Sequence, residues 1–63
     1  MKHTLKYWRT EKDFEMGEAH NLSTELSLED AMDIVHAFNR IGRHYAIEVY
    51  ETESGETIYH SEE

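Results

Sequence analysis

The fold of this chain is decided by residues 27–42, whose sequence is SLEDAMDIVHAFNRIG. Apolar side chains recur in this stretch at steps of three and four, which places them along one side of an α-helix. Ser27 is suited to cap the free N–H groups of the first turn, and Gly42 is suited to the left-handed conformation that ends a helix. Period, start and stop agree, so we predict one amphipathic helix. Its apolar positions are Leu28, Ala31, Ile34, Val35, Phe38 and Ile41.

The outer segments have the period of two that is typical of β-strands. Residues 3–10 alternate in this way and are rich in residues that favour strands. Residues 45–50 and 56–60 read as a hairpin whose loop ends in Gly55, a residue that tolerates positive φ. If that loop has four residues, Val49 faces Ile58 and both side chains share the core face.

Two segments between the first strand and the helix are less sharply defined. Residues 11–17 are charged and end in glycine, which predicts a turn or a loose hairpin loop. In residues 18–26, Leu22, Thr24 and Leu26 alternate with polar residues, which favours a second strand. The alternative is an irregular lead into the helix. The element order is therefore ββαββ, or βαββ if the second strand is absent.

A helix cannot bury its own apolar stripe, so the strands must supply a surface beneath it. We therefore predict an α+β fold: a small two-layer domain, residues 1–63, with a single helix packed on one face of an antiparallel sheet. The expected core comprises Leu5, Tyr7, Leu22, Leu26, Leu28, Ala31, Ile34, Val35, Phe38, Ile41, Ile47, Val49 and Ile58.

Composition restricts the classes of partner. The chain carries 14 Asp and Glu residues against 6 Lys and Arg residues, a formal net charge of -8 at pH 7. Direct nucleic-acid binding and attachment to an anionic membrane are disfavoured, because both need cations. A basic protein surface is the favoured partner instead. No apolar run is long enough for a signal peptide or a transmembrane helix, so we expect a cytoplasmic protein.

Large aromatic residues are expected on the sheet face that the helix leaves uncovered. The alternation places Trp8, Tyr50 and Tyr59 there, together with Ala46, Glu48 and Thr57. Such rings anchor partners or a homodimer interface. The alternative is that they only strengthen the sheet through cross-strand pairs.

The predicted hairpin also concentrates acidic side chains, namely Glu48, Glu51, Glu53 and Glu56. Spaced carboxylates on a rigid element can imitate phosphates and occupy a basic cleft, and complementary charge speeds encounter. The alternative is that these acids only keep a small domain in solution.

Residue patterns for catalysis are missing from the sequence. The 5 histidines are scattered without the i, i+4 spacing of a helical metal site, and there is no cysteine. No Gly-x-Ser-x-Gly elbow occurs, and 3 glycines do not form a phosphate-binding loop. We therefore expect a protein that is not an enzyme and that has no cofactor, metal or catalytic residues.

Overall size, acidity and element order, with the segment Leu26 to Asp30 entering the helix, resemble several small bacteriophage proteins that inhibit host machinery. These include phage inhibitors of RNA polymerase and of uracil-DNA glycosylase. The resemblance implies an inhibitor or nucleic-acid mimic, and it transfers no functional residue.

Charge and the aromatic face together favour a non-enzymatic protein that occupies a basic surface of another protein, for example a nucleic-acid-binding enzyme. Two alternatives stay open. One is a small homodimeric structural protein, and the other is a weak module that binds a metal or a small molecule through its histidines. The expected contact residues are Trp8, Glu48, Tyr50, Glu51, Glu53, Glu56 and Tyr59.

Overall fold

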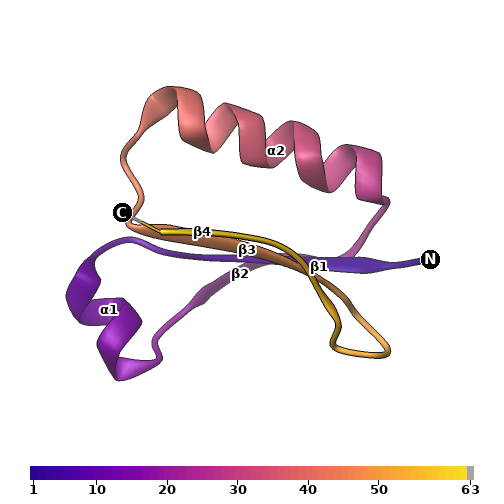
Figure 1. Ribbon diagram of the computed structural model, residues 1–63, viewed down its shortest axis with the longest axis horizontal. Coiled ribbons are helices and arrows are strands. Elements are labelled where there is room, and N and C mark those ends of the chain that lie inside the picture. The colour runs from indigo at the N-terminus through magenta and orange to yellow at the C-terminus, as the bar shows by residue number, and fades with distance from the viewer. Residues whose placement is uncertain (63) are drawn as a thin grey trace.

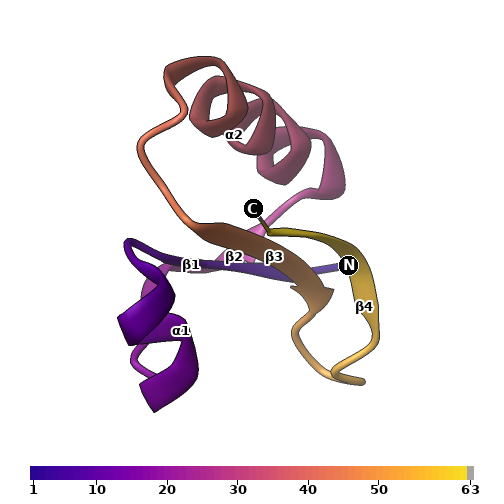
Figure 2. The same cartoon turned by 60° about the vertical axis from the view of Figure 1, so that its left-hand side comes forward.

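The computed structural model describes residues 1–62 as an antiparallel sheet with a helix on each face. Four strands lie in the order β2-β1-β3-β4, with all neighbours antiparallel. The long helix α2 crosses one face, and the short helix α1 lies against the other face at one end (Figures 1 and 2). The predicted α+β fold is confirmed, in roughly the order ββαββ. The elements are β1 (His3–Trp8), α1 (Glu11–Met16), β2 (His20–Leu26), α2 (Leu28–Ile41), β3 (Ala46–Glu51) and β4 (Thr57–Glu62).

Helix α2 begins and ends where the sequence predicts. The Ser27 hydroxyl accepts a hydrogen bond from the Asp30 N–H at 3.1 Å. At the other end, Gly42 has φ 70° and donates its N–H to the Phe38 carbonyl at 2.8 Å. These bonds satisfy backbone groups that a helix end leaves without partners. Both ends of α2 are therefore set by local chemistry rather than by packing.

The core lies between α2 and the central strands β1 and β3. Five fully buried side chains form it, and predicted core residues such as Tyr7 and Phe38 pack half-buried around them. No helix in residues 1–62 has the length and hydropathy needed to cross a bilayer. The five buried core residues are Leu5, Ala31, Val35, Ile47 and Val49.

The stripe of α2 is buried only in its middle. Leu28 at the first turn is 42% exposed and Ile41 at the last turn is 67% exposed, so both predictions of core burial are wrong. Figure 1 shows the reason at the carboxyl end, where α2 rises away from the sheet. Periodicity identifies which side of a helix is apolar, but it does not show how far along the helix the sheet stays in contact.

Two further residues predicted in the core, Leu22 and Ile58, lie outside it because the strands contain bulges. Leu5 pairs with Ser23 and the next residue of β1 pairs with Asn21, so Leu22 is an extra residue at one of the two register shifts in β2 and is 48% exposed. Ile58 is likewise the extra residue of β4 and is 42% exposed. The predicted pairing of Val49 with Ile58 is therefore wrong. A bulge shifts every later side chain to the other face, which a strict period of two cannot anticipate.

Residues 11–17, predicted as a turn or loose loop, contain the six-residue helix α1. The Thr10 hydroxyl caps it by accepting from the Asp13 N–H at 3.1 Å. At its end, Gly17 has φ 73° and donates to the Phe14 carbonyl, while Glu18 donates to the Asp13 carbonyl. This is the bond pattern of a Schellman motif. The following strand, β2, confirms the prediction for residues 18–26.

Candidate functional site

Trp8 is covered rather than available as an anchor. It lies on the face opposite α2, as predicted, but it is only 7% exposed because α1 packs over it. The Phe14 ring meets the indole edge-on, with centroids 5.0 Å apart and an interplanar angle of 76°. The prediction that Trp8 is uncovered is therefore wrong, because residues predicted as a turn or loop form the helix α1 that covers it.

Tyr59 lies on the opposite face from the one predicted. The bulge at Ile58 pairs Tyr59 with Val49 and turns its ring toward α2, where it packs half-buried against the core. Its hydroxyl lies 3.4 Å from the Asn39 amide nitrogen of α2, which donates to it. In a homodimer that pairs through the outer face, Tyr50 could therefore be buried at the interface, but Trp8 and Tyr59 could not.

Glu48 and Tyr50 lie on the predicted face around the amine of Lys6. The Lys6 Nζ is 3.4 Å from the Glu48 carboxylate and 5.3 Å from the centroid of the Tyr50 ring. It also lies 5.2 Å from the ring of Trp8. The Thr57 hydroxyl donates to the second Glu48 oxygen at 3.2 Å. Glu48 is thus paired within the chain, which removes most of its charge from the acidic surface.

The loop between β3 and β4 presents the remaining predicted acids. Glu51 is half-exposed, and Glu53 and Glu56 are exposed. The Glu51 N–H donates to the Glu56 carbonyl at 2.8 Å, and the Gly55 N–H donates to the Glu51 carbonyl at 2.8 Å. Gly55 has φ 75°, a conformation in which glycine is not strained. The loop therefore closes through its own backbone.

Thr52 connects this loop to the rest of the sheet through hydrogen bonds. Its hydroxyl donates to the Thr24 carbonyl of β2 at 2.8 Å and lies 2.8 Å from the Thr4 hydroxyl of β1. Because the Thr52 hydroxyl proton is already donated to the Thr24 carbonyl, the Thr4 hydroxyl is the donor of the second bond. The Thr52 N–H also donates to the Lys2 carbonyl at 3.0 Å. The acids of the loop are consequently held on a fixed support.

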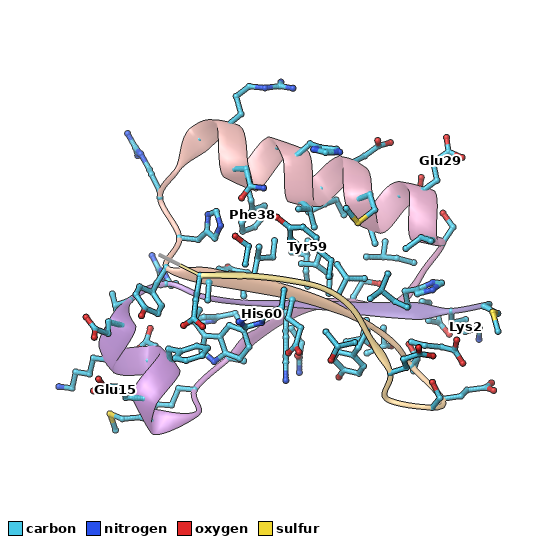
Figure 3. All side chains as sticks on the ribbon, viewed as in Figure 1. Lys2, Glu15, Glu29, Phe38, Tyr59 and His60 are labelled. Carbon is cyan, nitrogen blue, oxygen red and sulfur yellow. The ribbon has the colours of Figure 1, made fainter. Side chains whose placement is uncertain are left out.

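Three more exposed acids lie at the same end of the molecule, where β2 finishes and α2 begins. Figure 3 shows Glu29 and Lys2 at this end and Glu15 of α1 at the opposite end. Lys2 is 3.1 Å from Glu25, but both side chains are more than half exposed, so this pair contributes little to stability. We call this region the acidic end and define it by Glu25, Glu29, Asp30, Glu51, Glu53 and Glu56.

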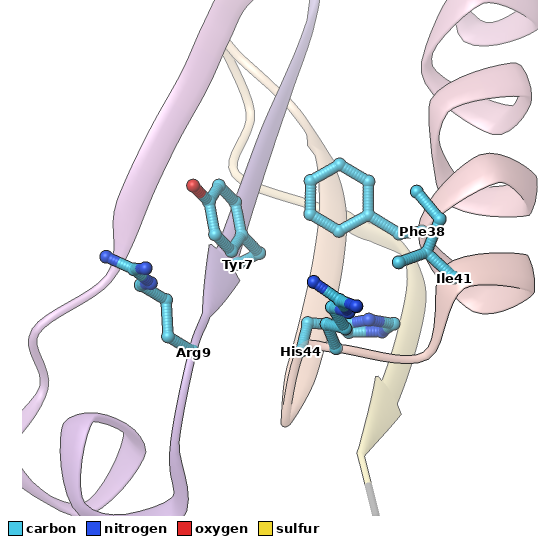
Figure 4. A pocket seen from close by; sticks show the side chains of 6 residues that line it. Tyr7, Arg9, Phe38, Ile41 and His44 are labelled. Carbon is cyan, nitrogen blue, oxygen red and sulfur yellow. The ribbon is translucent and has the colours of Figure 1, made fainter.

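The opposite end contains a concavity that the sequence analysis did not identify. Its volume is about 220 Å³, and it opens between the end of β1 and the carboxyl end of α2 (Figure 4). The rings of Phe38 and Tyr7 are in edge contact there, with centroids 4.9 Å apart, and Phe38 meets His44 at 5.5 Å. Two stretches that are far apart in the chain, residues 7–9 and 38–44, build this site, so no single local motif identifies it. The lining residues are Tyr7, Arg9, Phe38, Ile41, Arg43 and His44.

The histidines are spread over the molecule. His3 is buried with Nδ1 3.3 Å from the Leu26 carbonyl, His20 stacks on Tyr7, and His60 is 3.5 Å from Glu62. Within residues 1–62, no three side chains of the metal-binding types converge on a point that could hold an ion.

Comparison with known proteins adds no relative: no family, no curated protein and no solved structure matches this chain.

Proposed function

We propose that this chain is a non-enzymatic binding protein whose acidic end occupies a basic surface of another protein. The observation that carries the proposal is the hairpin loop, where Glu53 and Glu56 are exposed on a support fastened by Thr52 to two neighbouring strands. Three further exposed acids lie at the same end. Among the described residues, Lys2 is the cation that forms an ion pair there, with Glu25.

A fixed loop supports such a function because binding then orders few additional groups. Association costs free energy for every flexible side chain or loop that becomes immobilised. The acids of the loop already have their backbone held by hydrogen bonds, so less of this cost remains. Their charge would attract a basic partner over about 10 Å at moderate salt and speed the encounter.

The contact set of this proposal is narrower than the one expected from sequence. Trp8 is buried, Tyr59 faces α2, and Glu48 is paired with Lys6, so these three leave it. Glu51, Glu53 and Glu56 remain as the charged contacts, with Tyr50 as the adjoining ring. We assign the partner to the class of cytoplasmic nucleic-acid-binding proteins, whose basic clefts accept spaced anions, and the action to inhibition by mimicry.

Affinity capture from the source cell, followed by measurement with the purified partner, tests the proposal. The chain should retain a basic protein at about 50 mM salt and release much of it at about 300 mM, because screening strengthens over that range. Replacing Glu51, Glu53 and Glu56 together by Gln should weaken the measured affinity by about tenfold or more.

The matched control replaces Glu11, Glu15 and Glu18 by Gln. These exposed acids lie on or beside α1, and their replacement changes the net charge by the same amount. We expect less than about a twofold loss of affinity from the control, since it leaves the acidic end intact. Equal losses from both triple variants, or binding that ignores salt, would contradict the proposal.

A further inference from the structure

The concavity between β1 and the carboxyl end of α2 combines two features that point to a ligand unlike the partner proposed above. The first is charge. Arg9 and Arg43 line it, both are exposed, and neither has an acidic side chain within ion-pair distance in residues 1–62. The lysines of β1 and the N-terminus, by contrast, are paired with Glu48 and Glu25. Within residues 1–62, two guanidinium groups at one concavity are thus without an ion-pair partner.

The second feature is an apolar wall. Figure 4 shows the rings of Tyr7 and Phe38, which are in edge contact and form one wall of the concavity, with Arg9 and His44 below them. Ile41 completes the wall and is 67% exposed, although its position in the helical period belongs to the apolar stripe. An apolar occupant would cover Ile41 and remove its exposed surface from water.

The local field favours an anion. The carboxyl end of α2 contributes the negative pole of a helix dipole, equivalent to about half an elementary charge. Arg9 and Arg43 contribute two full positive charges, so attraction exceeds the repulsion from the helix end. Guanidinium groups also bind carboxylates through two parallel hydrogen bonds, which adds orientation to the attraction.

The volume limits the size of the occupant. About 220 Å³ corresponds to roughly seven water molecules at about 30 Å³ each. It is smaller than the ~300–1,000 Å³ of sites that enclose drug-sized ligands. One ring with one short acidic substituent fits within this space.

We propose that this concavity binds a small aromatic carboxylate, with its carboxylate held by Arg9 and Arg43 and its ring packed against Tyr7, Phe38 and Ile41. The site lies at the opposite end of the molecule from the hairpin acids. Its occupancy is therefore independent of the protein-binding function, and the two proposals can fail separately.

A titration followed by ¹⁵N NMR of the intact chain tests this site with phenylacetate as the probe. We expect shifts of the backbone amides of residues 9 and 41–44 that saturate with ligand. Phenylacetamide keeps the ring but lacks the charge, and acetate keeps the charge but lacks the ring. Each should bind about tenfold or more weakly than phenylacetate, because each loses one of the two features.

The matched variants are Arg43→Gln and Arg40→Gln. Both remove one exposed arginine near the end of α2, but only Arg43 lines the concavity. Arg43→Gln should weaken phenylacetate binding by about tenfold, and Arg40→Gln by less than about twofold. Because both side chains are exposed, neither change should unfold the chain.

Three results would overturn the proposal. Equal binding of phenylacetate and phenylacetamide would remove the role of charge. Equal losses from the two arginine variants would show attraction to the chain as a whole rather than to this site. Tighter binding of phenyl phosphate than of phenylacetate would reassign the site to phosphate monoesters.

Discussion

The two faces of the sheet are covered in different ways. On one face, α2 spans 14 residues and buries a continuous apolar core that includes Leu5, Val35 and Ile47. On the other face, Phe14 of the six-residue helix α1 covers Trp8. Beside it, the amine of Lys6 contacts the Tyr50 ring and the Glu48 carboxylate. In a long helix, enough apolar residues recur at helical spacing for the helix to be recognised in the sequence. A short helix is defined almost entirely by its capping residues.

The largest expected effect lies on the α2 face. Leu5→Ala removes a side chain that is 0% exposed and leaves a cavity in the centre of the core, which costs about 3–4 kcal/mol. A domain of this length has a free energy of unfolding of about 3–9 kcal/mol, so much of it would be lost. Urea denaturation followed by circular dichroism measures the change. A loss below about 1 kcal/mol would contradict the placement of the core between α2 and β1.

A smaller effect is expected on the α1 face. Phe14→Ala removes half-buried apolar surface and should cost about 1–2 kcal/mol. The chain has 1 tryptophan, so its fluorescence reports directly on this cover, and the emission should shift to the red as Trp8 meets water. Met16→Ala is the control, because Met16 lies on the same helix but is 59% exposed. An unchanged emission in Phe14→Ala would show that α1 does not shield the indole.

The glycines that end the two helices test whether the two faces of the sheet unfold together. Gly17 and Gly42 have φ of 73° and 70°, and a Cβ at either position would meet no atom within 4 Å. Alanine is therefore penalised only by the left-handed backbone, about 1 kcal/mol at each site. Gly42→Ala should lower the free energy of unfolding by that amount. Gly17→Ala should lower it by less, because α1 can open locally while the α2 core stays folded. Equal losses in urea denaturation would mean that both helices unfold as one unit.

The smallest effect concerns the polar contacts beside α1. Lys6 and Glu48 are 3.4 Å apart, with side chains 29% and 19% exposed, so their mutual coupling should be about 0.5–1 kcal/mol. A double-mutant cycle with Lys6→Met and Glu48→Gln measures it, and the coupling should fall as salt rises. A coupling energy that is zero within error would show that the two side chains lie close together without stabilising the fold.

The sequence predicted the candidate contact residues less well than it predicted the fold. Glu53 and Glu56 are exposed as expected, because charged loop residues stay in water in almost any packing. Trp8 and Tyr59 are misplaced, since their surroundings depend on a helix and a bulge elsewhere in the chain. The basic concavity was missed because Tyr7 and Arg9 are far in sequence from the stretch Phe38 to His44 that completes it.

The bounds of α2, the strand segments around it and the excess of acid could all be inferred from the amino-acid sequence without a structure. These follow from caps, period and composition, which act between residues that are near neighbours in the chain. Which rings are covered, and where two arginines lie beside an apolar wall, follow from the three-dimensional packing. Those outcomes depend on the bulges in β2 and β4 and on how α2 diverges from the sheet, and both are set by packing between distant segments.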